Sequence, residues 1–434
     1  MKIYPAKRLE GILTLGGDKS ISHRAVMISS IARGETRIEN FSTSADCAST
    51  LRCLENLGVE IQRENSTVLV KGVDKTGFQK PEIELDCGNS GTTVRLLSGI
   101  LAGQQFETIL TGDESLSGRP MKRIIEPLSL FGARVESREN RLPLRIRGKN
   151  PLSAIEYAPA VASAQVKSCV LLAGLNAAAG GKTSFIEKTP TRDHTERMLR
   201  WFGAQVEIAE TEKGKRISVS GASRLTAKDF RVPSDISSAA FFLVAASCLE
   251  NSDLTIKTVG LNPTRRAVVD VLKSFGANIE IFNEKEDCNE AVGDLRVSGG
   301  KNLQVKVDSN IIGGEIIANL IDEIPILAVF GTQIESGLEI RDAAELRVKE
   351  SDRIAAVVEN LRRMNARVEE FPDGFRVEKS ALKGARLDSF GDHRIAMAFA
   401  VAGLLATGET EIAGAEAAGV SFPEFFRTLK SVTK

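Results

Sequence analysis

The sequence predicts an α/β (α+β) protein of two lobes, built from six repeated β/α units, three in each lobe. The first observation is that an apolar run with a polar opening recurs six times, about every 70 to 86 residues. The second is that each run is apolar on nearly all sides, so a helix formed by it must be enclosed by other elements. The third is that the sixth unit lacks the strand pair found in the others. These observations predict helices inside each lobe and strands outside.

Each unit repeats one order of elements. We expect the apolar helix to be followed by a short strand, an amphipathic helix and, in five units, a strand pair. The strand pairs begin near the segments LGVE, FGARVE, FGAQVE, FGANIE and MNARVE. The sixth unit stops after its helix, at Lys434, and residues 2–15 alternate like a strand pair. We therefore expect the N-terminal segment to supply the missing hairpin.

The predicted lobes follow from this arrangement. With 434 residues, the chain is longer than one hydrophobic core usually accommodates. If the N-terminal segment completes the sixth unit, a discontinuous lobe of residues 1–17 and 236–434 contains both termini, and residues 18–235 form an inserted lobe. The chain then crosses between the lobes twice, near residues 16–20 and 231–236. We expect a hinge there, with the active site in the cleft between the lobes.

Charge and cysteine usage exclude several classes of function. The 57 Lys and Arg residues balance 57 Asp and Glu residues, so no global field favours nucleic acid or an anionic membrane. The six cysteines show no C-x-x-C pair and no metal-ligand spacing with the three histidines, so we expect buried, reduced thiols. No signal peptide and no run of eighteen apolar residues is evident. We expect a cytoplasmic monomer that binds neither nucleic acid nor a membrane.

The starts of the predicted helices carry the candidate chemistry. A helix N-terminus presents unsatisfied N–H groups and the positive end of the helix dipole, and so attracts phosphate or carboxylate. One such start would look like an ordinary helix cap, but four of them carry Lys or Arg within four residues of the polar opening. These starts are Gly17–Ser20, Gly88–Thr92, Ser163–Lys167 and Asp392–Arg394. Together they predict an anion-binding site.

A further cluster of cations opens an amphipathic segment. Lys349 and Arg353 are four residues apart, which predicts that they share one helix face, and Glu350 stands between them in the sequence. A single cationic run is ordinarily a solvated helix face. Arg recognises phosphate and carboxylate by flat, bidentate contacts, whereas Lys offers a compact charge. The density of cations therefore favours an anionic ligand.

Five segments, in order along nearly the whole chain, resemble the motifs of one enzyme family. They are Gly17–Arg24, Gly88–Arg95, Ser117–Met121, Arg347–Arg353 and Gly391–Met397. The family they resemble is that of 5-enolpyruvylshikimate-3-phosphate synthase, or 3-phosphoshikimate 1-carboxyvinyltransferase. The resemblance implies that each lobe is an inside-out α/β barrel.

The resemblance also implies a reaction of the shikimate pathway, which serves aromatic amino acid biosynthesis. The enzyme would transfer the enolpyruvyl (carboxyvinyl) group of phosphoenolpyruvate to the 5-hydroxyl of shikimate-3-phosphate and release phosphate. Each substrate carries a phosphate and a carboxylate, together about six negative charges. A chain without net charge can hold them only where its cations are concentrated.

Two sets of residues match the substrate-binding positions of the family. By this resemblance, shikimate-3-phosphate is held by Lys19, Ser20, Arg24, Ser163, Ala164, Gln165, Arg192, Asp322 and Lys349. Phosphoenolpyruvate is held by Lys19, Gly91, Arg119, Gln165, Arg353 and Arg394.

The implied chemistry is addition followed by elimination through a tetrahedral intermediate. The methylene C3 must gain a proton and the 5-hydroxyl must lose one, which calls for general acid and base groups near the same carbon. By resemblance, Asp322 is the base on the 5-hydroxyl and Glu350 is the acid-base group at the methylene. Lys349 is a further candidate for proton transfer. Neither redox nor metal chemistry is required, so we expect no cofactor and no metal.

The sequence departs from the family pattern at a few positions. Gly16 stands where a proline commonly precedes the glycine, and Leu96 follows Arg95 where another branch has proline. Val420 precedes Ser-Phe-Pro where many members carry lysine, so any role of that lysine has no equivalent residue here. The chain thus resembles the branch described as less sensitive to glyphosate, whereas Gly91 keeps the hydrogen side chain associated with access of this inhibitor.

Three alternatives make different demands on the sequence. The sister enzyme that acts on UDP-N-acetylglucosamine shares the fold, but it usually has Lys-Asn in place of Lys19-Ser20 and a cysteine in the loop where residues 113–118 have none. An RNA 3'-phosphate cyclase needs a nucleophilic histidine near its C-terminus, and none follows His393. A binding scaffold has little reason to place two carboxylates among clustered cations.

Overall fold

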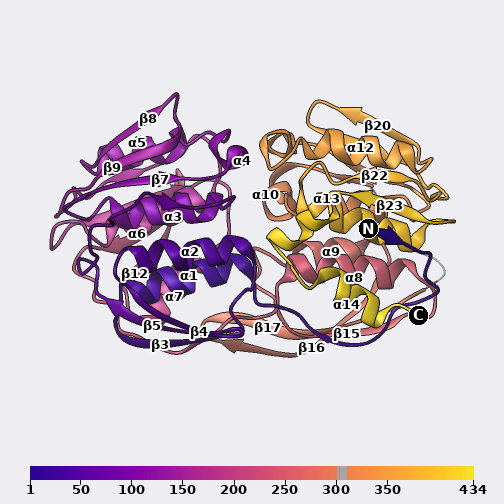
Figure 1. The fold of residues 1–434 in the computed structure, drawn as a ribbon, viewed down its shortest axis with the longest axis horizontal. Helices are drawn as coiled ribbons and strands as arrows, with labels where there is room; N and C mark the ends of the chain where they lie inside the picture. Colours follow the sequence, from indigo (N-terminus) through magenta and orange to yellow (C-terminus); the bar gives the residue numbers. More distant parts are fainter. Residues whose placement is uncertain (301–302, 304–309) are drawn as a thin grey trace. The chain divides into compact units, whose positions relative to one another are not determined.

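A computed structural model describes residues 1–300, 303 and 310–434 and divides the chain into two compact units (Figure 1). Unit 1 comprises Met1–Gly16, Pro233–Glu286 and Ala291–Lys434. Unit 2 comprises Gly17–Val232 and Asp287–Glu290. The chain therefore leaves unit 1 after Gly16 and returns to it at Pro233. The short Asp287–Glu290 segment is a further part of unit 2 that the predicted lobe boundaries did not separate.

Each unit contains three helices that are buried almost along their whole length. In unit 2 they are α1 (Lys19–Ser30), α3 (Gly91–Leu101) and α6 (Ala164–Gly174). In unit 1 they are α8 (Ile236–Cys248), α11 (Ile324–Gly331) and α13 (His393–Leu405). These are the six apolar runs of the sequence. They are apolar on nearly all sides, although α1 also buries polar side chains such as His23 and Arg24, and enclosure in the unit removes most of their surface from water.

Amphipathic helices follow in every unit of the repeat. They are α2 (Ala45–Asn56), α5 (Lys122–Leu130), α7 (His194–Trp201), α9 (Ala267–Ser274), α12 (Arg353–Arg363) and α14 (Phe425–Val432). Shorter helical turns are α4 (Glu114–Ser117), α10 (Ile317–Leu320), η1 (Gly314–Ile316), η2 (Ala344–Val348) and η3 (Ala415–Val420).

Among the described residues, the strands form six mixed sheets, and Figure 1 shows the sheets of each unit flanking its helices. The orders in unit 2 are β14–β3–β5–β4, β6–β7–β9–β8 and β10–β11–β13–β12. Their bounds are β3 (Arg33–Glu39), β4 (Glu60–Glu64), β5 (Thr67–Val73), β6 (Leu85–Asp86), β7 (Glu107–Thr111), β8 (Arg134–Arg138), β9 (Arg141–Arg147), β10 (Glu156–Tyr157), β11 (Lys182–Glu187), β12 (Val206–Thr211), β13 (Gly214–Ser220) and β14 (Phe230–Arg231).

The other three sheets have the orders β16–β17–β15–β2, β18–β19–β21–β20 and β1–β23–β22. Their bounds are β1 (Lys2–Ile3), β2 (Glu10–Thr14), β15 (Asp253–Gly260), β16 (Asn278–Asp287), β17 (Glu290–Ser298), β18 (Ile311–Ile312), β19 (Leu338–Ile340), β20 (Val368–Phe371), β21 (Gly374–Val377), β22 (Arg386–Asp388) and β23 (Thr410–Ala413). The mixed α/β class predicted from the repeat is confirmed. The turn of the β16–β17 hairpin is the segment assigned to unit 2.

The N-terminal segment does not form the predicted hairpin. Its strand β1 pairs antiparallel with β23, whereas β2 pairs in parallel with β15 of a different sheet. In unit 2, the strand β14 takes the equivalent place, parallel to β3. Both β2 and β14 lie directly before the chain passes to the other unit, so each pairs with a strand of the unit it is about to leave. The segment thus completes two sheets of unit 1.

One backbone motif explains the repeated F-G-A segments. In five units the residue after the helix cap has positive φ, which suits Gly and, less often, Asn. The residues are Gly58, Gly132, Gly203, Gly276 and Asn365. In each case the next amide donates to a carbonyl five residues back, for example Ala133 N to Leu128 O at 3.2 Å. This Schellman ending stops the amphipathic helix and starts the strand pair.

Each unit has its own hydrophobic core, made of its buried helices and the inner faces of its sheets. Within the described part of the chain, no helix has the length and apolar character needed to cross a membrane. The same residues contain no group of three His, Cys, Asp or Glu that could hold a metal ion. All six cysteines are free, and four of them are buried.

Candidate functional site

The starts of α1, α3 and α6 gather polar residues in unit 2, and capping side chains fix them. Asp18 Oδ1 accepts from Ile21 N at 2.8 Å at the start of α1. Ser90 caps α3 and Ser163 caps α6 in the same way. These caps satisfy one N–H group each and leave others of the first turn directed at the polar region. We call this region the unit 2 cluster; it contains Lys19, Ser20, Arg24, Gly91, Arg119, Ser163, Ala164, Gln165 and Arg192.

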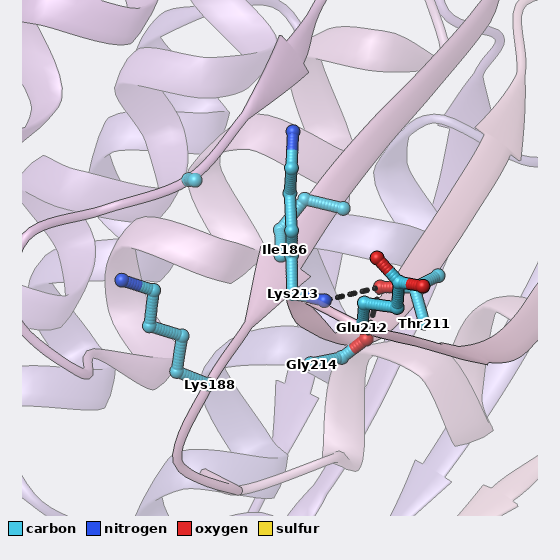
Figure 2. A pocket seen from close by; sticks show the side chains of 7 residues that line it. Ile186, Lys188, Thr211, Glu212, Lys213 and Gly214 are labelled. Carbon is cyan, nitrogen blue, oxygen red and sulfur yellow. Dashed lines mark hydrogen bonds between the residues drawn. The ribbon is translucent and has the colours of Figure 1, made fainter.

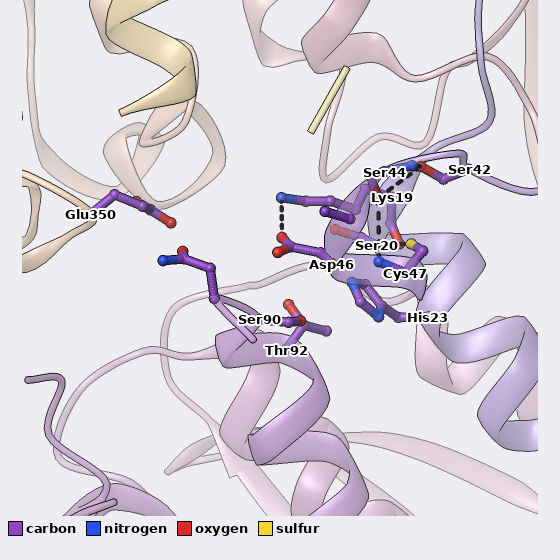
Figure 3. Close-up of polar contacts among 12 residues, drawn as sticks. Lys19, Ser20, His23, Ser42, Ser44, Asp46, Cys47, Ser90, Thr92 and Glu350 are labelled. Carbon is purple, nitrogen blue, oxygen red and sulfur yellow. Dashed lines mark hydrogen bonds and ion pairs between the residues drawn. The ribbon is translucent and has the colours of Figure 1, made fainter. Parts of the chain in front are cut away.

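Lys19 is the first residue of α1 and forms an ion pair in the unit 2 cluster (Figure 3). Its Nζ lies 2.8 Å from Asp46 Oδ2 at the start of α2, and the two side chains are 20% and 11% exposed. Ser44 caps α2 and thereby holds Asp46 at the first turn of that helix. The ammonium is therefore accessible, and its charge is partly balanced by one carboxylate.

Arg24 lies one turn further along α1 and is 2% exposed. Its guanidinium donates to Thr195 Oγ1 at 2.8 Å, Ser20 O at 2.8 Å and Ser168 Oγ at 2.9 Å. Arg192 Nη1 donates to Ser20 Oγ at 3.4 Å. Burial, and then the neighbouring Arg192, lower the pKa of Arg24 to about 10. Two guanidinium groups thus donate to Ser20, one to its carbonyl and one to its hydroxyl, in an arrangement suited to an anion.

A second group surrounds the start of α3. Arg95 Nη1 donates to Gln165 Oε1 at 2.6 Å, and Gln165 Nε2 donates to Thr92 Oγ1 at 3.0 Å. A Cβ atom on Gly91 would lie 2.7 Å from Arg95 Nη1 and 3.5 Å from Arg119 Nη1. A side chain here would therefore displace the Arg95 guanidinium, whereas the Arg119 guanidinium would remain at an ordinary contact distance.

Buried hydroxyl groups connect the starts of α1, α2 and α3. His23 Nδ1 lies 2.7 Å from Thr50 Oγ1, which lies 2.7 Å from Thr93 Oγ1. Thr93 Oγ1 in turn donates to the cap Ser90 at 2.7 Å. His23 is fully buried, and burial lowers its pKa to about 3. This series of hydrogen bonds links the three helices, and burial keeps His23 neutral.

We expect the buried His23 to make the protein sensitive to acid. Its pKa is 6.5 when unfolded and about 3 when folded, so below pH 6.5 the unfolded chain binds a proton that the folded chain does not. The free energy of unfolding should fall by about 1.4 kcal/mol per pH unit from this group alone. In His23→Gln, urea unfolding between about pH 7.5 and about pH 5 should show roughly 2 kcal/mol less loss than in the wild type. Parallel losses in both proteins would contradict this role.

Lys167 does not contribute to the anion site as the sequence predicted. It is in the first turn of α6, but its side chain is fully buried. Its Nζ lies 2.9 Å from Glu187 Oε1 and 2.8 Å from Glu196 Oε1. Its charge is used inside unit 2, so the start of α6 offers Ser163, Ala164 and Gln165 without a cation of its own.

In unit 1, Arg353 opens α12 and is enclosed by carboxylates. Its Nε lies 2.7 Å from Asp392 Oδ2, its Nη2 lies 2.7 Å from Glu350 Oε2, and its Nη1 lies 3.5 Å from Asp322 Oδ1. The side chain is 1% exposed. Burial opposes the charge, but the three carboxylates outweigh it and raise the pKa of Arg353. Burial likewise opposes the charge of Asp392, yet Arg353 lowers the pKa of that carboxyl.

The starts of α8, α11 and α13 meet the same cluster. Arg394 Nη1 donates to Asp322 O at 2.8 Å, and its Nη2 lies 3.8 Å from Asp322 Oδ2. Glu323, 1% exposed, accepts a hydrogen bond from Ser237 and lies 3.7 Å from Arg394. Arg265 Nη2 also donates to Ser237 Oγ, at 2.5 Å. We call this set the unit 1 cluster; with Arg353, Glu350 and Asp392 it holds four carboxylates and three guanidinium groups.

Lys349 and Arg353 do not share a helix face. Lys349 follows η2, which ends at Val348, and α12 begins only at Arg353. The turn between them carries Glu350, which reaches forward to Arg353. Lys349 Nζ lies 3.6 Å from Glu345 instead. The spacing rule failed because it assumes one continuous helix.

A surface hollow of about 770 Å³ is lined by none of these residues (Figure 2). It is lined in unit 2 by Ala158, Ile186, Lys188, Thr211, Glu212, Lys213 and Gly214. None of these is a predicted site residue, and the hydrogen bonds drawn there close the β12–β13 turn. The hollow offers two surface lysines without a converging buried group, so we place the candidate site at the helix starts.

The structure brings together most of the predicted residues within each unit. Unit 2 gathers Lys19, Ser20, Arg24 and Arg192 around α1, and Gly91, Arg119 and Gln165 around α3. Unit 1 gathers Asp322, Glu350, Arg353 and Arg394, whereas Lys349 makes its described ion pair outside that set. Sequence reasoning gave no site role to four residues that hold these groups: Asp46, Arg95, Glu323 and Asp392. Of these, Arg95 and Asp392 lie within the matched motifs and could have been named.

Comparison with known proteins identifies relatives along the full chain. The family model described as EPSP synthase (3-phosphoshikimate 1-carboxyvinyltransferase) matches residues 3–429. A 3-phosphoshikimate 1-carboxyvinyltransferase of Solibacter usitatus is 52% identical over 435 residues, covering 100% of this chain and 99% of the relative. One of Pelotomaculum thermopropionicum is 52% identical over 436 residues, covering 100% and 98%. The solved EPSP synthase of Acinetobacter baumannii superposes with a TM-score of 0.87 at 40% identity, covering 100% and 98%.

Proposed function

The chain belongs to the EPSP synthase family, the 3-phosphoshikimate 1-carboxyvinyltransferases, and we propose a role in that reaction for the residues of each cluster. The enzyme transfers the carboxyvinyl group of phosphoenolpyruvate to shikimate-3-phosphate, a step of the shikimate pathway. The observation that carries the proposed roles is the gathering of guanidinium groups, helix starts and carboxylates that match the motifs of the family.

Shikimate-3-phosphate is held chiefly by the unit 2 cluster. Arg24 and Arg192 both donate to Ser20, so an anionic group there meets a hydroxyl, two nearby guanidinium groups and the first N–H groups of α1. The remaining ligands proposed for this substrate are Lys19, Ser163, Ala164, Gln165, Asp322 and Lys349. Asp322 and Lys349 belong to unit 1.

Phosphoenolpyruvate is held by Arg119 and Gly91 at the start of α3, by Lys19 and Gln165, and by Arg353 and Arg394. The Asp322 contact of Arg353 is its longest, at 3.5 Å. A substrate carboxylate that takes the place of this contact would keep Arg353 paired and would release Asp322 toward the reacting atoms. The carboxylates of unit 1 thus balance its cations until the substrate arrives.

The proton transfers fall to unit 1. Asp322 accepts the proton of the 5-hydroxyl as its oxygen attacks C2 of phosphoenolpyruvate, and it gives this proton to the departing phosphate when the intermediate collapses. Glu350 delivers a proton to C3 and removes one from it when phosphate leaves, so the group returns to its starting state. Lys349, in the same turn as Glu350, is the further proton-transfer group. Positioned acids and bases of this kind typically accelerate a reaction by about 10² to 10⁴.

The activity is tested by phosphate release. The purified chain with about millimolar shikimate-3-phosphate and phosphoenolpyruvate should release phosphate, and omission of either substrate should abolish the release. Absence of release with both substrates would refute the proposed roles at once. UDP-N-acetylglucosamine in place of shikimate-3-phosphate serves as the control acceptor and should give none.

We expect Lys19→Ala to weaken the binding of both substrates. The change removes a charge-assisted contact and leaves Asp46 without its ammonium partner in an anion site, so affinity should fall by roughly 1.5 to 3 kcal/mol, about 10- to 150-fold. Calorimetric titration measures this loss. Lys71→Ala, which removes an exposed ion pair with Glu60 in the same unit, is the matched control and should bind normally. Wild-type affinity in Lys19→Ala would rule out the role of the α1 start.

The remaining proposals concern the state of the protein in the cell. Each unit covers its buried helices with its own sheets, which supports a monomer, and sedimentation equilibrium tests it. The six free cysteines suit a reducing compartment, and phosphorylated substrates are retained inside cells by their charge. Both points support a cytoplasmic location, which fractionation would test.

A further inference from the structure

Lys167 is a lysine with no exposed surface in the first turn of α6. Its Nζ makes three contacts: Glu187 Oε1 at 2.9 Å, Glu196 Oε1 at 2.8 Å and Thr191 O at 3.4 Å. All three partners lie between residues 187 and 196, in the segment that runs from the end of β11 into α7. The buried ammonium is therefore an anchor for this segment and cannot touch a substrate.

Thr191 is held at each of its polar atoms. Its carbonyl accepts from Lys167, and its N–H donates to Glu187 Oε1 at 3.0 Å. Its hydroxyl also donates to Glu187 Oε1. The backbone at Thr191 is thereby fixed on both sides of its Cα, and the next residue is Arg192. These hydrogen bonds therefore set the direction in which the Arg192 side chain projects from the segment.

A second set of contacts fixes the end of the same segment. Thr195 Oγ1 lies 2.7 Å from Ser168 Oγ, and both hydroxyls accept from Arg24. Ser168 follows Lys167 on α6, so two successive residues of that helix hold the segment. Arg192 Nη1 then lies 3.4 Å from Ser20 Oγ.

The charges of this group are balanced only as a set. Burial opposes the charge of Lys167, but Glu196 and Glu187 raise its pKa, so the ammonium form is kept. Burial raises the pKa of Glu196. Removal of the ammonium would leave two buried carboxyl groups without their cation, and the segment would have to rearrange to hydrate them.

We propose that Lys167 is a positioning residue for shikimate-3-phosphate, because it fixes the 187–196 segment so that Arg192 lies beside Ser20. The proposal rests on the proposed function. It states that the binding of shikimate-3-phosphate depends on the buried Lys167 side chain, whereas the binding of phosphoenolpyruvate does not. The residues assigned to phosphoenolpyruvate around α3 lie outside this segment.

The first experiment measures both Michaelis constants in Lys167→Met. The KM for shikimate-3-phosphate should rise at least tenfold, while the KM for phosphoenolpyruvate stays within twofold. Lys182→Met, which removes an exposed ion pair with Glu207 at the start of β11, is the matched control and should leave both constants unchanged. Equal increases in both constants would mean that Lys167 merely stabilises α6, and unchanged constants would mean that the segment needs no anchor; either result overturns the proposal.

A double-mutant cycle tests whether Lys167 acts through Arg192. If it does, Lys167→Met/Arg192→Ala should bind shikimate-3-phosphate within twofold of Arg192→Ala alone, as measured by calorimetry. Additive losses would place the effect elsewhere and overturn the proposal. If Lys167→Met does not fold, Glu187→Gln, which removes the charge but keeps an acceptor for Thr191, is measured in its place and should raise the same KM selectively. Phosphate release by the wild type tests the proposed function separately.

Discussion

Asp322→Asn is expected to lower turnover by about 10² to 10⁴ and to leave the affinity for shikimate-3-phosphate unchanged or improved. The asparagine keeps the size and one acceptor oxygen of the carboxylate but cannot take up the proton of the 5-hydroxyl. The backbone of residue 322 stays in place because its carbonyl, which accepts from Arg394 at 2.8 Å, is unaffected. The loss of a negative charge from an anion site favours ground-state binding. Such a split identifies an interaction made only in the transition state.

Single-turnover kinetics with both substrates, together with calorimetry for shikimate-3-phosphate alone, measure the two effects of Asp322→Asn. Asp270→Asn serves as the control, because Asp270 is a surface partner of Arg266 on α9. If Asp322→Asn turns over at the wild-type rate, or fails only because it cannot bind shikimate-3-phosphate, Asp322 is a ligand or a helix cap. Glu350, 2.7 Å from Arg353, then becomes the candidate base.

The fold was predictable because the same helix ending, which requires a residue with positive φ, recurs along the sequence. A residue with positive φ follows the cap of five of the six amphipathic helices, and at three of these places Gly132, Gly203 and Gly276 stand in F-G-A segments. The buried helices were equally predictable, since a helix that is apolar on nearly all sides must be enclosed by other elements. Mixed sheets around buried helices follow from these two signals.

The strands at the edges of the sheets could not be predicted. β6, β10 and β14 have two residues each, too short to show any alternation. Residues 2–15 do alternate in the sequence, but alternation says nothing about which partner a strand selects. β1 and β2 pair with β23 and β15, whose positions are set by the remainder of unit 1. The predicted hairpin failed for this reason.

The residue types of the candidate site were predictable, but the direction of each side chain was not. Lys19 and Lys167 both occupy the first turn of a polar helix start, yet Lys19 is accessible and Lys167 is buried. The difference arises from Glu187 and Glu196, which lie about 20 to 30 residues further along the chain and reach Lys167 only in the folded unit. Sequence spacing carries no information about such tertiary partners.

In the unit 1 cluster, too, the sequence did not show which partners the charged side chains have. The sequence predicted a concentration of cations, and the structure pairs them with carboxylates. Arg353 has three carboxylate neighbours, and Asp392 among them is wholly buried. The carboxylates of the unit 1 cluster therefore outnumber its guanidinium groups, and we expect the stability of unit 1 to depend on Arg353.

Arg353→Met is expected to lower the stability of unit 1 by about 3 to 5 kcal/mol and to abolish measurable binding of phosphoenolpyruvate. The methionine has a similar apolar stem, but it leaves the buried Asp392 without the guanidinium 2.7 Å away, and an uncompensated buried charge of this kind is strongly destabilising. Arg353→Lys should not restore the wild type, because one compact ammonium group cannot replace a guanidinium that meets Asp392, Glu350 and Asp322 at separate nitrogens. Urea unfolding followed by circular dichroism measures the change.

Two comparisons separate this buried network from a general effect on α12. Arg363→Met, which removes an exposed ion pair with Glu359 on the same helix, should change the free energy of unfolding by less than about 1 kcal/mol. Arg353→Met combined with Asp392→Asn should recover a large part of the lost stability, because the amide needs no cation, and it should still fail to bind phosphoenolpyruvate. Equal losses in Arg353→Met and Arg363→Met, or no recovery in the double variant, would show that Arg353 stabilises unit 1 through packing of its stem. Its charge would then be needed for the substrate alone.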